Sequence, residues 1–260
     1  MTSDLHVYRY GPDEPVRVLA LHGLTGHGRR WEPFAEQQLP GIGVAAPDLL
    51  GHGRSSWSAP WTIDANVAAL AALLRGAADG AVVVVGHSFG GAVALHLAAA
   101  HPELVRALVL LDPAVGLDGD RMRRLAEQTL ASPDYADRAE ARADKLAGSW
   151  SEVDGALLDA ELDEHLVDWP GGRVGWRMSL PAVIAYWSEL ARPVVVPTVS
   201  VPTTVLRAAK VQPPYATDAL LDALRRRLGE ALEVRELDCD HMVPLARPDE
   251  SGAAVRRHLT

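Results

Sequence analysis

The sequence is poor in cysteine and in positive charge. Its 260 residues include one cysteine, Cys239, which excludes an internal disulfide framework and a cysteine-rich metal site. Acidic residues outnumber Lys and Arg by 34 to 25, which argues against a nucleic-acid-binding surface or a polybasic membrane patch. The stretch Met1–Pro15 lacks the apolar centre of a secretory signal, so we expect no leader there and a cytoplasmic protein.

The longest uncharged stretch could be mistaken for a membrane span. Gly80–Ala100 has no Asp, Glu, Lys or Arg over 21 residues, which is long enough to cross a bilayer as a helix. Its first half is a run of valines, and Gly86, Gly90 and Gly91 follow. β-Branched residues followed by glycines favour a buried strand, a sharp turn and a helix of small residues. We therefore expect no stable membrane insertion.

Short apolar runs alternate with helical patterns along most of the chain. Six runs are typical of buried parallel strands: Val16–Leu21, Gly43–Ala46, Ala81–Val85, Leu104–Leu111, Val201–Leu206 and Leu232–Leu237. Leu5–Tyr10 is a candidate antiparallel edge strand, and Thr62 and Thr217 are candidate N-caps of amphipathic helices. This alternation predicts an α/β fold, with a mostly parallel sheet covered by helices on both faces.

The alternation stops between about Val115 and Ser200, where the sequence is helical and charged, with no convincing strand. Leu117–Asp168 alone contains 14 acidic and 6 basic residues. A charged helical insertion between core strands predicts a lid over the sheet edge where ligands bind, although solvated helices beside the core are the alternative. We therefore divide the chain into a core, residues 1–114 and 201–260, and a helical cap, residues 115–200.

One short motif indicates a nucleophile. Gly86-His87-Ser88-Phe89-Gly90 has the glycine, any, serine, any, glycine pattern of a nucleophile elbow, between a valine strand and an alanine-rich helix. In such an elbow the serine has a strained backbone, and a side chain two residues before or after it would collide with the neighbouring strand or helix. Ser88 is therefore the candidate nucleophile, and a serine in an ordinary tight turn is the alternative.

A serine hydroxyl needs a base to remove its proton, and position selects one of the ten histidines. Four others are less suitable, because they lie on the helix after the serine, in the insertion or at the C-terminal end: His96, His101, His165 and His258. His241 follows the last expected strand at the same sheet edge as Ser88. It also fits the chain order serine, acid, histidine.

A glycine-rich turn, His22-Gly23-Leu24-Thr25-Gly26, follows the first expected core strand. Such a turn lets backbone N–H groups approach a substrate, and we expect the N–H groups of Leu24 and Phe89 to form an oxyanion hole. A phosphate-binding loop is the competing interpretation, but no Gly-Lys-Ser/Thr and no dinucleotide fingerprint accompanies the turn. We interpret His22 as structural.

Together these motifs resemble the α/β-hydrolase superfamily. The resemblance rests on His22-Gly23, on Pro47-Asp48-Leu49-Leu50-Gly51-His52-Gly53-Arg54-Ser55, on the Ser88 elbow and on His241. Within the superfamily the chain is most similar to small actinobacterial lipases and esterases. The resemblance implies an eight-stranded core with a helical cap after strand six, and a structural role for Asp48.

The acid of the expected triad departs from the pattern. Most relatives carry the aspartate after strand seven, where this sequence has Lys210, whose charge would oppose the imidazolium. Asp112, at the end of Leu104–Leu111, is the best substitute, although Asp-Pro is also common as a turn cap. Asp218, Asp238 and Asp240 stay open as alternatives.

These residues predict a serine esterase that acts on a small-molecule ester without a metal or an organic cofactor. Carbon–carbon bond hydrolases, lactonases, thioesterases and acyltransferases share the triad and stay open, as does a binding protein without turnover. Six apolar residues of the insertion could line an acyl pocket or form its own core: Trp176, Met178, Leu180, Val183, Ile184 and Trp187. We expect short- or medium-chain esters to be preferred, and strongly anionic substrates to be weakly repelled by the acidic cap.

Overall fold

A seven-stranded sheet forms the centre of the computed structural model, which describes residues 5–12 and 15–260. The prediction for the stretch 1–15 therefore lies partly outside the described residues. The strand order is β1-β3-β2-β4-β5-β8-β9, and only the β1–β3 pair is antiparallel. The strands are β1 (Val7–Tyr10), β2 (Val18–Leu21), β3 (Val44–Pro47), β4 (Val82–His87), β5 (Val105–Leu111), β8 (Thr203–Ala208) and β9 (Leu232–Leu237).

Every strand of this sheet overlaps an apolar run in the sequence, which confirms the predicted α/β fold and the antiparallel edge strand. The number of core strands differs from the resemblance, because the central sheet of the described residues has seven strands where eight are expected. No apolar run of the core sequence corresponds to an eighth strand. The insertion therefore follows β5, the fifth strand of this sheet in chain order, instead of a sixth strand.

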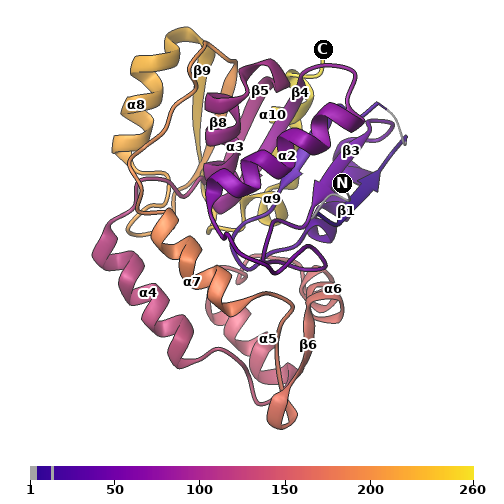
Figure 1. The fold of residues 1–260 in the computed structure, drawn as a ribbon, viewed down its shortest axis with the longest axis vertical. Coiled ribbons are helices and arrows are strands. Elements are labelled where there is room, and N and C mark those ends of the chain that lie inside the picture. Colours follow the sequence, from indigo (N-terminus) through magenta and orange to yellow (C-terminus); the bar gives the residue numbers. More distant parts are fainter. Residues whose placement is uncertain (1–4, 13–14) are drawn as a thin grey trace.

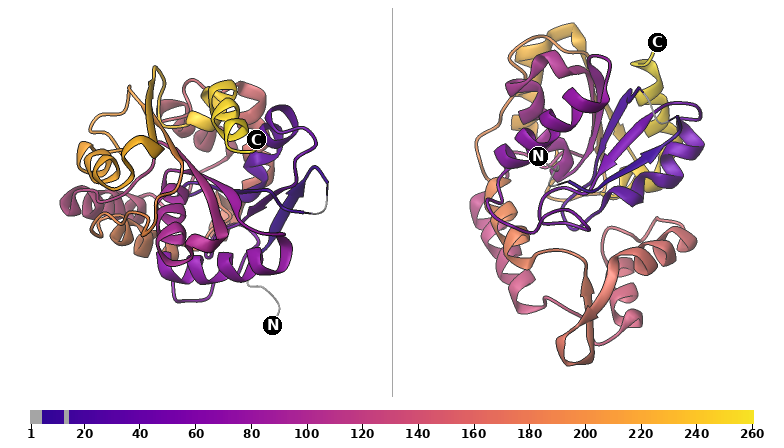
Figure 2. Two further views of the ribbon diagram at one scale, coloured as in Figure 1. Left: turned by 90° about the horizontal axis from the view of Figure 1, so that it is seen from above. Right: turned by 45° about the vertical axis from the view of Figure 1, so that its right-hand side comes forward.

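Helices cover both faces of the sheet (Figures 1 and 2). Each face of the sheet has its own buried apolar cluster. Helices α2, α3 and α8 pack on one face, and α1, α9 and α10 pack on the other. Thr62 and Thr217 cap α2 and α8 as predicted, since their hydroxyls accept hydrogen bonds from Ala65 N and Leu220 N. The helices are α1 (Glu32–Gln38), α2 (Ile63–Ala77), α3 (Phe89–Ala100), α8 (Asp218–Leu228), α9 (Val243–Ala246) and α10 (Pro248–Arg257).

The uncharged stretch Gly80–Ala100 is divided between β4 and α3. The first ten residues of α3 are buried, because the helix packs between the sheet and α2. Over the part of the chain that the structure describes, no helix is long and apolar enough to cross a membrane.

The insertion, residues 115–200, lies against one end of the sheet (Figures 1 and 2). Its helices are α4 (Gly119–Ala131), α5 (Arg138–Ala147), α6 (Gly155–His165) and α7 (Leu180–Glu189). The expectation that it contains no strand is wrong, because β6 (Leu166–Trp169) and β7 (Arg173–Trp176) form an antiparallel hairpin. Gly171 and Gly172 have positive φ in the turn, so Pro-Gly-Gly between two short runs is the hairpin signal that we overlooked.

Candidate active site

Ser88 lies in the sharp turn between β4 and α3, with φ 54° and ψ −116°. Left-handed backbone of this kind is strained in a residue with a side chain, and close neighbours hold it in place. A Cβ atom at Gly86 would lie 2.4 Å from Gly90 O, and one at Gly90 would lie 2.4 Å from Leu21 O. Only glycine fits at these two positions, so the elbow presents the Ser88 hydroxyl at the end of the sheet.

The imidazole of His241 joins Ser88 to Asp112. Its Nε2 lies 2.9 Å from Ser88 Oγ, and its Nδ1 lies 2.6 Å from Asp112 Oδ2. A carboxylate accepts but does not donate, so Nδ1–H donates to Asp112 and Nε2 accepts from the Ser88 hydroxyl. The structure thus brings three residues from the ends of β4, β5 and β9 into one hydrogen-bonded chain.

Asp112 is fully buried at the end of β5. Its φ of 44° is again left-handed, and its N–H donates to Leu206 O at 2.7 Å. The second carboxylate oxygen, Oδ1, accepts a hydrogen bond from Ala208 N at 3.3 Å. Backbone contacts with β8 therefore orient the carboxylate toward the His241 ring.

The three alternative acids do not contact the ring. Asp218 is 81% exposed and pairs with Arg207, and Asp238 is 89% exposed. Asp240 accepts from the backbone N–H of His241 at 2.6 Å and leaves the ring nitrogens to other partners. Lys210 turns to the surface and pairs with Glu152 of the insertion at 2.5 Å, so its charge is compensated there.

Two rings beside His241 were missed by the sequence reasoning. The Tyr215 ring lies 4.3 Å from the His241 ring, and the His87 ring lies 4.7 Å from it, centroid to centroid. His87 Nε2–H also donates to His241 O at 2.8 Å, and burial lowers the pKa of His87 well below its usual value. A neutral His87 therefore holds the His241 loop, and its place inside the Ser88 motif is the signal that could have revealed it.

The glycine-rich turn after β2 packs directly against Ser88. A Cβ atom at Gly23 would lie 2.9 Å from His87 Nδ1 and 3.1 Å from Ser88 Cβ. His22 supports this turn, because Nδ1–H donates to Gly23 O at 2.8 Å and Nε2 accepts from Leu49 N at 2.9 Å. Phe89 is the first residue of α3, and the first N–H groups of a helix have no partner within it.

A cavity of about 320 Å³ opens between the core and the insertion. Ser88, His241 and Leu24 lie in its wall, together with three of the six apolar residues expected for an acyl pocket, which are Trp176, Met178 and Trp187. Val183 is instead buried in the apolar core of the insertion. Among residues 5–12 and 15–260, no group of three or more His, Cys, Asp or Glu side chains could hold a metal ion.

Sequence comparison shows the family to which the chain belongs. Residues 18–254 match the alpha/beta hydrolase family. The chain belongs to this family. It is 62% identical over 259 residues to the protein named Lipase LipV of Mycobacterium tuberculosis, covering 100% of this chain and 99% of that protein.

Solved structures agree with the sequence comparison. E-2-(acetamidomethylene)succinate hydrolase superposes with a TM-score of 0.82 at 22% identity, over 98% of this chain and 94% of the other. The M. tuberculosis esterase Rv0045c gives a TM-score of 0.74 at 25% identity, over 100% of this chain and 90% of that one. The first of these likenesses shows the fold alone.

Proposed function

We propose that this α/β hydrolase cleaves carboxylic esters through an acyl-enzyme intermediate on Ser88. One observation carries the proposal: the hydrogen-bonded chain from Ser88 Oγ through His241 to Asp112 ends in a cavity large enough for a small acyl group. The full-length similarity to a lipase supports an ester as the substrate.

Acylation begins when Ser88 Oγ attacks the ester carbonyl carbon and His241 Nε2 takes the hydroxyl proton. The imidazolium that forms is stabilised by the buried Asp112 carboxylate. The carbonyl oxygen gains negative charge, which the N–H groups of Leu24 and Phe89 stabilise as hydrogen-bond donors. Removal of one such donor typically raises the barrier by about 3–4 kcal/mol. The tetrahedral intermediate then collapses: the carbonyl re-forms, the bond between the acyl carbon and the alcohol oxygen breaks, and His241 Nε2–H donates its proton to that oxygen, so the alcohol leaves.

Deacylation repeats these steps with water. His241 Nε2 takes a proton from a water molecule, the oxygen of which attacks the acyl carbon, and the same N–H groups hold the oxyanion. The proton then passes back to Ser88 Oγ, which releases the carboxylic acid. No step uses a metal or an organic cofactor.

The insertion acts as a cap over this site. Its Trp150, Trp176, Met178 and Trp187 form the wall of the cavity across from the core loops. A largely apolar wall limits the length of the acyl chain that the cavity accepts. This arrangement supports short- and medium-chain esters as substrates.

A fluorophosphonate probe tests the proposal, because it reacts covalently with an activated serine. We expect the wild-type protein to be labelled and the Ser88→Ala variant to lose both label and esterase activity. Ser149→Ala is the matched control, since Ser149 lies in the same cavity wall but outside the hydrogen-bonded chain. Equal labelling of wild type and Ser88→Ala, or no labelling and no ester cleavage, would show instead a binding protein or a different nucleophile.

A further inference from the structure

Lys145, on α5 of the insertion, lies in the wall of the same cavity as Ser88. Its side chain is only 10% exposed, which is unusual for a lysine. The ammonium nitrogen lies 4.7 Å from the centre of the Trp150 ring and 4.3 Å from that of the Trp176 ring. These ring faces attract a cation but accept no ordinary hydrogen bond, so the donors of Lys145 stay mostly unused.

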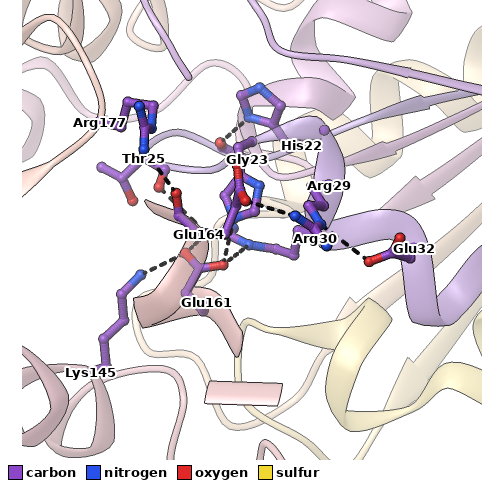
Figure 3. A network of polar contacts seen from close by, with 12 residues as sticks. His22, Gly23, Thr25, Arg29, Arg30, Glu32, Lys145, Glu161, Glu164 and Arg177 are labelled. Atoms are coloured by element: carbon purple, nitrogen blue, oxygen red, sulfur yellow. Dashed lines mark hydrogen bonds and ion pairs between the residues drawn. The ribbon is translucent and has the colours of Figure 1, made fainter. Parts of the chain in front are cut away.

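The anion beside Lys145 is already engaged by other groups (Figure 3). Glu161 of α6 receives hydrogen bonds from Arg30 at 2.5 and 3.0 Å, and one from His27 at 2.9 Å. Lys145 Nζ reaches the same carboxylate only at 3.5 Å. The Glu161 side chain is 2% exposed, so a single buried negative charge serves two cationic side chains, Arg30 and Lys145.

The surroundings of Lys145 contain less negative charge than the cation needs. Burial lowers the pKa of Lys145 to about 8, although Glu161 opposes the shift. The other charged or titratable groups that interact with it are Arg30, which disfavours the charged form, Asp144 on its own helix, which favours it, and His165, the pKa of which burial lowers well below its usual value. Asp144 is exposed and accepts a hydrogen bond from the Tyr135 hydroxyl at 2.8 Å, so solvent screens much of its charge.

We propose that Lys145 binds an anionic oxygen group, such as a carboxylate, carried by the ester substrate away from the bond that is cleaved. The inference rests on the proposed esterase function and names a substrate class for it. A carboxylate that enters the cavity accepts charge-assisted hydrogen bonds from the unused ammonium donors and supplies the missing negative charge. The excess acidic residues of the insertion oppose this binding weakly, because salt screens exposed charges beyond about 8 Å.

Matched ester pairs test the assignment. On the acyl side, the p-nitrophenyl monoester of adipic acid is compared with p-nitrophenyl hexanoate. On the alcohol side, the butanoyl ester of 4-hydroxybutanoate is compared with pentyl butanoate, which has a single ester bond and no charge, and acid release is followed by pH-stat. We expect wild-type kcat/KM to favour the anionic member of at least one pair, and the pair that responds identifies the side that carries the anion.

Substitution of the lysine isolates its charge. In Lys145→Met, kcat/KM for the preferred anionic ester should fall roughly ten- to hundredfold, mainly through KM, while the neutral ester changes little. Lys145→Arg should retain part of the preference. Lys210→Met removes the only other lysine, which lies outside the cavity wall, and should leave the preference unchanged.

A pH series on the wild type gives a second readout that needs no variant. The ratio of kcat/KM for the anionic ester to that for the neutral ester should fall as pH rises through about 8, because Lys145 loses its charge.

Different results would contradict the esterase function and the binding of an anion by Lys145. If the neutral ester is cleaved by the wild type but neither anionic ester is favoured, or Lys145→Met lowers both esters equally, Lys145 only anchors the cap and this inference is overturned. If no ester is cleaved and no fluorophosphonate label appears, the esterase function itself fails.

Discussion

The carboxylate of Asp112 lies 2.6 Å from Nδ1 of His241, across 129 positions of the sequence. The carboxylate that contacts His241 thus comes from the end of β5, whereas the loop after β8 carries Lys210, which pairs with Glu152. Both strand ends lie at the same edge of the sheet, so either can present a carboxylate to the same histidine. Asp112 reaches the ring from a fully buried position, where solvent screens its charge least.

Asp112→Asn should lower kcat by about 10⁴, because an amide neither stabilises the imidazolium nor enforces the tautomer with the proton on Nδ1. Steady-state kinetics with a p-nitrophenyl ester measure the loss, and circular dichroism checks that the fold is intact. Asp218→Asn is the control, since Asp218 is exposed and pairs with Arg207 instead of His241. Near-normal activity of Asp112→Asn would remove Asp112 from the mechanism.

The local parts of the fold could be predicted from sequence because their signals are local. Short apolar runs predict the positions of the strands, and Thr62 and Thr217 are predictable as N-caps because a cap is a property of a few adjacent residues. Ser88 could be singled out for the same reason, since its strained turn depends on the two glycines that flank it.

The parts that escaped prediction depend on contacts between distant segments. Tyr215 contacts the His241 ring from a loop that has no recognisable sequence pattern. Glu161 cannot be distinguished in the sequence from the other acidic residues of its helix, and only the fold brings it into contact with Arg30 of the core. Lys145 likewise belongs to a strongly charged stretch, and only packing shows that its ammonium lies between two tryptophan rings. Such contacts cannot be predicted from the periodicity or the composition of the sequence.

Glu161→Gln should lower the free energy of unfolding by about 3–5 kcal/mol, because it leaves buried Arg30 and Lys145 without their anion. Urea unfolding followed by fluorescence measures the change. Glu127→Gln is the control, because it breaks an exposed ion pair with Arg123 that solvent screens and should cost far less. Equal effects of the two changes would mean that the buried cluster adds nothing to stability.

Gly90→Ala should both destabilise the protein and reduce kcat. The new methyl group would lie 2.4 Å from Leu21 O, and the shift that relieves this clash displaces the Ser88 elbow. We expect a loss of about 1–3 kcal/mol in thermal or urea unfolding. Gly76→Ala, in α2 with no atom near its Cβ position, should instead be neutral or stabilising by up to about 1 kcal/mol. A fully active Gly90→Ala variant would contradict the close packing of the elbow.

The acyl-chain preference should follow the size of the cavity. For p-nitrophenyl esters, we expect kcat/KM to peak at short or medium chains and to fall for long ones, because the cavity is only about 320 Å³. Trp187→Ala removes a large ring from the wall and should move the peak toward longer chains. A steady rise to the longest chains in the wild type would show that the cap does not limit the acyl group.

Acidification should destabilise the fold through His52. Its fully buried ring packs against Phe89 and Tyr186, Nδ1–H donates to Leu50 O at 3.1 Å, and burial lowers its pKa to about 4. The unfolded chain takes up the proton near pH 6.5, whereas the folded chain does not until about pH 4. The unfolded state therefore binds more protons within this window, and stability falls as pH decreases from 6.5 to 4.

His52 alone should account for a loss of roughly 3 kcal/mol across that window, since each pKa unit corresponds to about 1.4 kcal/mol. Urea unfolding at a series of pH values gives the slope. His52→Phe should make the slope of the unfolding free energy against pH shallower. The lost hydrogen bond changes stability by the same amount at every pH and therefore does not affect the slope. His6→Phe, at an exposed ring, should keep the wild-type slope. Parallel curves for wild type and His52→Phe would mean that His52 takes up its proton equally well in the folded chain.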